Sequence, residues 1–131
     1  MTGVTHQDAD HAQAAREADA RSRLLAAGAS SLPRAPWLHE RQPPSAVDLI
    51  RFAVWRAQAD RLGEEDLLAA LTLLPSARAE VDQAEAALLF TARACGLSWP
   101  RISLAMGLKS PQAAQQRFGR VTGRTRNPGS P

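Results

Sequence analysis

The spacing of apolar residues predicts helices along most of the chain and no strands. From residue 47 to residue 62, apolar side chains recur at intervals of three and four, as on one side of a helix, and Ser45 can cap its start. Phe52 and Trp55 widen this stripe, so we expect the helix to bury two sides. Leu67–Leu74 follows three acidic residues that suit a helix N-terminus, and Pro75 is expected to end that helix. A longer helix is expected from about residue 77 to residue 95, with Ser76 as a potential cap and Asp82 with Glu85 as an alternative capping box. The predicted fold class is therefore an all-α domain of about five helices.

The two ends of the chain have a different pattern from the middle. Residues 10–27 are compatible with a helix, but few of them could fill a core, so we expect a solvated or conditionally ordered helix. Prolines recur between residues 30 and 44 and predict an extended connector, in which Trp37 and Leu38 are expected to contact the core. We therefore expect a flexible leader and proline-rich connector over 1–44, a helical domain over 45–122 and a disordered basic tail over 123–131.

The helix expected over residues 77–95 has apolar residues on two sides. One face carries Val81, Ala84, Leu88, Ala92 and Cys95. Phe90 lies nearly opposite Leu88, and a helix that is apolar on two sides is usually central and buried. Cys95 is the lone cysteine, which excludes an intrachain disulfide and fits a reducing cytoplasm. We expect its side chain to be a small buried hydrophobe.

Charge is distributed unevenly along the 131 residues, of which 26 are alanine. The formal net charge is only +3, but residues 1–85 carry all 13 acids and nine of the 16 bases. Residues 86–131 carry the remaining seven bases and no acid. A basic segment of this kind favours binding of a polyanion. No apolar stretch is long enough for a membrane helix and no secretory signal opens the chain, so we expect a cytoplasmic protein without membrane contact.

The basic segment also contains the start and stop signals of two short helices. Gly96 can end the preceding helix, Ser98 can cap the next one, and Pro100 suits its first turn. Gly107 is expected to end that helix, and Ser110 followed by proline is expected to begin another. In this last helix the inner side is expected to consist of Ala114, Phe118 and Val121, and the outer side of Gln112, Gln115, Gln116 and Arg120. Two short helices joined by a glycine turn predict a C-terminal helix-turn-helix at about residues 96–122.

The stretch GLSWPRISLAMGLKSPQAAQQRF resembles the helix-turn-helix of actinobacterial DNA-binding proteins, which is itself similar to the fourth region of sigma factors. The resemblance covers roughly residues 78–122 and rests on Gly96, Ser98, Trp99, Ile102, Gly107, Leu108 and the step from Gln112 to Ala114. The turn around Gly107 is one residue longer than in many relatives, and Gly119 lies where it could end the second helix early.

The resemblance implies that the second helix of the pair enters the major groove. It assigns base recognition to Ser110, Gln112, Gln115, Gln116 and Arg120, with Lys109 nearer the phosphates. The chemistry agrees, because glutamine can bind both N6 and N7 of adenine and arginine both O6 and N7 of guanine. The expected phosphate partners are Arg101, Lys109, Arg117, Arg124 and Arg126.

No set of residues in the sequence forms a recognisable catalytic, metal-binding or cofactor-binding pattern, so we expect a non-enzymatic protein. The predicted function is binding of double-stranded DNA in the nucleoid, as a homodimeric transcriptional regulator or a DNA-compacting protein. The residues from Val47 to Leu74 are the expected regulatory body and dimer surface. The alternative is a protein-interaction module that contacts a sigma factor or RNA polymerase.

Overall fold

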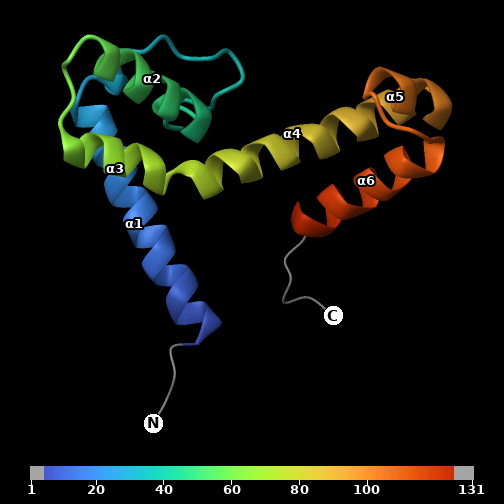
Figure 1. Cartoon of the computed structure of the whole chain (residues 1–131), viewed down its shortest axis with the longest axis horizontal. Coiled ribbons are helices and arrows are strands. Elements are labelled where there is room, and N and C mark those ends of the chain that lie inside the picture. Colours follow the sequence, from blue (N-terminus) through green and yellow to red (C-terminus); the bar gives the residue numbers. More distant parts are fainter. Residues whose placement is uncertain (1–4, 126–131) are drawn as a thin grey trace. The chain divides into compact units, whose positions relative to one another are not determined.

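The computed structural model describes residues 5–125, and over that range the chain is helical without strands (Figure 1). The elements are α1 (His6–Ala26), the short 3-10 helix η1 (Ala29–Ser31), α2 (Ala46–Gln58), α3 (Glu64–Thr72), α4 (Leu74–Ala94), α5 (Trp99–Ala105) and α6 (Pro111–Thr125). The all-α prediction is confirmed. The chain forms two compact units that divide between Ala77 and Arg78, rather than a leader and a single helical domain divided near residue 44.

Helix α1 is part of the core of the first unit, which corrects the prediction of a solvated leader. It packs mainly against α3. Leu24 is completely buried together with Leu49 of α2 and Leu73, and Ala20 is also buried. Sequence reasoning missed this because the two leucines of α1 are adjacent at its end and its other apolar residues are alanines, so the helix shows only a weak apolar face.

The buried surface of α2 agrees with the predicted one at Phe52 but not at Val54 or Trp55. Leu49, Phe52 and Ala53 are buried, whereas Val54 is 54% exposed and Trp55 is 61% exposed. Trp55 lies against the edge of the core, with its ring centroid 6.3 Å from that of Phe52. Trp37 of the connector is 80% exposed, so the expected anchoring of the connector by this side chain is wrong.

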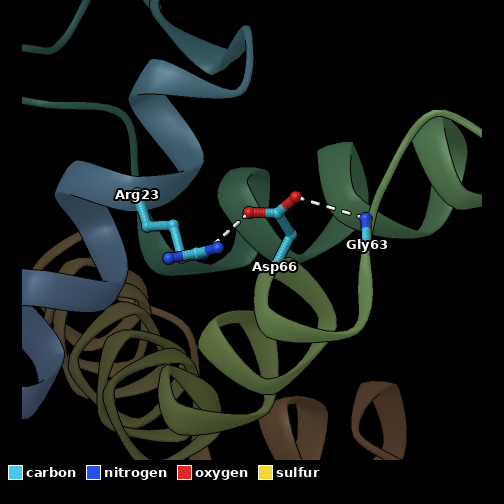
Figure 2. Close-up of polar contacts among 3 residues, drawn as sticks. All are labelled: Arg23, Gly63 and Asp66. Atoms are coloured by element: carbon cyan, nitrogen blue, oxygen red, sulfur yellow. Dashed lines mark hydrogen bonds and ion pairs between the residues drawn. The ribbon is translucent and has the colours of Figure 1, made fainter.

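Asp66 joins the start of α3 to α1 (Figure 2). One carboxylate oxygen accepts a hydrogen bond from the backbone N–H of Gly63, at 3.3 Å, and so caps the helix. The other oxygen forms an ion pair with the Nε of Arg23, at 2.9 Å. The predicted acidic first turn is therefore present, and it also fixes the neighbouring helix.

The break between α3 and α4 lies earlier than predicted. Helix α3 ends at Thr72 and α4 begins at Leu74, so that Pro75 lies in the first turn of α4 instead of ending the helix before it. A proline fits there because the first helical N–H groups have no partner within the helix. Ser76 therefore lies inside α4, and its hydroxyl donates to the carboxylate of Glu17, at 2.6 Å.

Beyond Arg78, α4 buries much less of its surface than its sequence predicts. Leu89 is buried, but Val81, Leu88 and Phe90 are 59%, 69% and 66% exposed. Cys95 is also exposed, which corrects the prediction of a buried thiol. The expectation that both apolar sides of this helix are covered is thus wrong for the residues from 78 to 94.

At the other end of the chain, α6 continues to Thr125. Gly119 does not end it, and residues 123–125 are helical where a disordered tail was expected. The rest of that expected tail, residues 126–131, and the first four residues of the leader lie outside the described part of the chain.

Candidate nucleic-acid interface

The second unit is built around a small apolar core shared by α4, α5 and α6. Its buried residues are Leu89, Ile102, Ala114 and Val121. Trp99 closes one side of this core: its ring lies 6.0 Å from that of Phe118 in α6, and the guanidinium of Arg93 in α4 lies 4.8 Å above it. The indole of Trp99 in α5 therefore contacts both α4 and α6.

The corner between α4 and α5 is a Schellman turn. Gly96 adopts a φ of 91°, a conformation that strongly favours glycine. The N–H of Gly96 donates to the carbonyl of Arg93 at 3.0 Å, and the N–H of Leu97 donates to that of Ala92, also at 3.0 Å. Ser98 then begins α5, because its hydroxyl oxygen accepts from the N–H of Arg101 at 3.3 Å. The start and stop signals predicted here are confirmed.

The corner between α5 and α6 repeats this chemistry. Gly107 has a φ of 71°, and the N–H of Leu108 donates to the carbonyl of Ser103 at 2.9 Å. Ser103 is 3% exposed, and its hydroxyl donates to the carbonyl of Ser110 at 2.6 Å. This bond ties α5 to the residue that precedes α6. The direction in which α6 leaves the corner is therefore fixed by a partly buried hydrogen bond as well as by packing.

Ser110 is the N-cap of α6, so its side chain is already hydrogen-bonded within the protein. Its hydroxyl oxygen accepts from the N–H of Ala113 at 3.2 Å, and the residue is half-buried. Among the residues predicted to recognise bases, Ser110 therefore has the least freedom to contact a partner through its side chain.

The other four predicted base-recognition residues lie on the outer side of α6. Their side chains are all exposed, and their helical spacing gathers them on one side: Gln112, Gln115, Gln116 and Arg120. Ala114 and Val121 on the inner side are 0% and 1% exposed, so α6 is divided between a core side and a polar side as the sequence predicts. The exposed side of α6 contains no acid.

The predicted phosphate partners do not form one group. Lys109 is exposed in the corner before α6, and Arg101 is exposed on α5. Arg117 instead turns towards α4, where its Nε lies 3.0 Å from a carboxylate oxygen of Glu85. Arg126 lies outside the described residues, and the position of Arg124 is known only for its backbone within α6. The pairing of Arg117 was missed because its partner is 32 residues away in the sequence.

An apolar groove of about 590 Å³ lies beside this polar surface, between α4 and α5. Its walls include Val81, Leu88, Ile102 and Met106, and Glu85 and Arg101 are the charged residues that line it. Sequence reasoning did not predict this groove, although the apolar face of α4 that forms one wall was visible as a periodic stripe.

The described residues contain no group of three or more histidine, cysteine, aspartate or glutamate side chains arranged to hold a metal ion. Over the same part of the chain, no helix has the length and apolar character needed to cross a membrane. Comparisons with protein families, with curated proteins and with solved structures gave no match. The resemblance to actinobacterial DNA-binding proteins therefore stays a prediction.

Proposed function

We propose that the second unit binds double-stranded DNA, with α5 and α6 acting as a helix-turn-helix and the outer side of α6 entering the major groove. In this proposal the protein is a transcriptional regulator in the bacterial nucleoid. The observation that carries the proposal is the composition of that outer side: three exposed glutamines and an exposed arginine, without an acid anywhere beyond residue 85. These side chains match the donor and acceptor pattern of purine edges.

The basic residues support this assignment by their exposure. Arg101 and Lys109 are exposed on the helix and the corner that precede α6, where they can approach phosphates while α6 contacts bases. Arg117 contributes less in this proposal, because it is already paired with Glu85. Phosphate contacts supply affinity and the glutamines supply discrimination between sequences.

The test compares glutamine variants on two kinds of duplex. A preferred sequence is first selected from a random pool, and the full chain is then titrated against that sequence and a scrambled one. Gln112→Ala and Gln116→Ala are each expected to weaken the selected complex by about 1–3 kcal/mol and the scrambled one very little. Lys109→Ala is expected to weaken both alike. Gln83→Ala, an exposed glutamine on α4, is the matched control and should change neither.

Equal losses on both duplexes for the glutamine variants would contradict base recognition and favour a DNA-compacting protein. Absence of binding to any duplex at low salt would overturn the proposal, and the alternative of a module that contacts a sigma factor or RNA polymerase would then be favoured.

A further inference from the structure

The exposed apolar face of α4 has a two-fold pattern in its sequence. The face is a stripe of five residues, hereafter the α4 stripe: Val81, Ala84, Leu88, Ala92 and Cys95. Ala84 and Ala92 lie four residues on either side of Leu88, and Val81 and Cys95 lie seven residues on either side of it. Side-chain size follows the same symmetry, because the largest residue is central, alanines flank it and medium-sized residues lie at the ends.

The α4 stripe is also largely uncovered. Val81 is 59% exposed and Leu88 is 69% exposed, while Ala84 and Cys95 are exposed as well. The stripe forms one wall of the apolar groove between α4 and α5, so the apolar surface continues sideways to Ala105. Intervals of three and four residues are those with which one helix packs against another.

Charge along the second unit reverses across the stripe's centre. Before Leu88, α4 carries Glu80, Asp82 and Glu85 and a single base, Arg78, and from Leu88 to the end of α5 the charged residues are Arg93 and Arg101. An antiparallel pair of these helices brings the acidic half of each against the basic half of the other. A parallel pair would bring like charges together.

We propose that this protein associates with a second copy of itself through the α4 stripe, with the two α4 helices antiparallel about a two-fold axis at Leu88. A two-fold interface requires a surface that is complementary to itself, and both the residue sizes and the charges of the stripe meet that requirement. Leu88 contacts Leu88 of the second copy at the axis, and Val81 lies opposite Cys95. This surface differs from the one predicted between Val47 and Leu74.

The size of the α4 stripe determines how strongly two copies of the protein are expected to associate. From Val81 to Cys95 the helix spans about 21 Å and is about 10 Å wide, so a single helix crossing covers much less than the roughly 800 Å² per partner of a standard interface. The dimer is therefore expected to dissociate in the micromolar range rather than the nanomolar range. The outer side of α6 is not part of the stripe and stays free.

Sedimentation velocity of the full chain without DNA tests this inference independently of the proposed function. The wild-type protein is expected to pass from monomer to dimer as its concentration rises through the micromolar range. Leu88→Glu, which brings two like charges together at the axis, should weaken the dimer roughly tenfold or more. Phe90→Glu is the matched control, because Phe90 is 66% exposed on the opposite side of the same helix, and it should leave association unchanged.

Three further variants test the rival surface and the position of the two-fold axis. Leu71→Glu alters an exposed leucine of α3 and should also leave the dimer intact. In a Cys95→Ser background, Leu88→Cys should form a disulfide-linked dimer under mild oxidation, whereas Ala87→Cys should not. A wild-type monomer at every concentration would overturn the proposal, as would a dimer that survives Leu88→Glu or that is broken equally by Leu71→Glu.

Discussion

The hydrogen bond from Ser103 to Ser110 is expected to determine how firmly α6 is held against α5. Ser103→Ala removes a hydroxyl that is 3% exposed and donates to the carbonyl of Ser110 at 2.6 Å. A typical intramolecular hydrogen bond contributes about 0.5–1.5 kcal/mol, and leaving a fully buried partner unsatisfied costs about 1–3 kcal/mol. Ser110 is half-buried, so water can reach its carbonyl in part, and we expect the free energy of unfolding of the second unit to fall by about 1 kcal/mol.

Tryptophan fluorescence can follow this unit alone. Trp99 is the tryptophan of the second unit, and Trp37 and Trp55 of the first unit are 80% and 61% exposed, so both can be replaced by phenylalanine with little loss. With a slope of about 1 kcal/mol per molar urea for so small a unit, Ser103→Ala should lower the urea midpoint by about 1 M. Leu104→Ala, at a neighbouring position that is 81% exposed, is the control and should shift it little. Equal midpoints for the two variants would refute this reasoning.

Three further predictions concern other parts of the fold. Leu24→Ala should destabilise the first unit by about 2–5 kcal/mol, because Leu24 is completely buried. A thermal transition that is unchanged in circular dichroism would contradict the burial of α1 in the core. Gly119→Ala should stabilise α6 by about 0.5–1 kcal/mol, since an added Cβ meets nothing within 4 Å. A lower urea midpoint, followed by Trp99 fluorescence, would show instead that the glycine is needed there. Asp66→Ala should cost more stability in urea unfolding than Arg23→Ala, because Asp66 both caps α3 and pairs with Arg23; equal losses would mean that the cap contributes nothing.

The elements that could be predicted from the sequence are those defined by local chemistry. Gly96 and Gly107 specify turns through their backbone conformation, and Ser98 and Ser110 specify caps through their hydroxyls. The limits of α5 and the start of α6 therefore agree with the predicted ones. The polar side of α6 is similarly local, because it depends only on helical spacing. The exposure of its glutamines was therefore predictable, whereas the function assigned to them stays a prediction.

The features that could not be predicted depend on contacts between distant segments. Leu24 becomes buried only because α3 covers it, and Arg117 turns away from the polar side only because Glu85 is within reach. Trp55 is exposed although Phe52, one helical turn before it, is buried. The packing of α2 against the other helices decides which of these two apolar positions faces the core. Periodicity identifies an apolar face but not whether another segment covers it. The face of α4 around Leu88 shows this most clearly, because it is apolar and yet exposed.

Binding of the second unit to duplex DNA, as proposed, requires contacts with phosphates, and these are measured through the salt dependence of binding. The full chain is titrated with a labelled duplex at a series of salt concentrations. Each phosphate contact contributes about 0.9 to the slope of log K against log salt, so contacts by Arg101 and Lys109 alone predict a slope of roughly −2. We expect the wild-type protein to show a slope of at least that size, and Lys109→Ala to reduce the slope by roughly one. No binding at low salt, or binding that is insensitive to salt, would contradict the proposal.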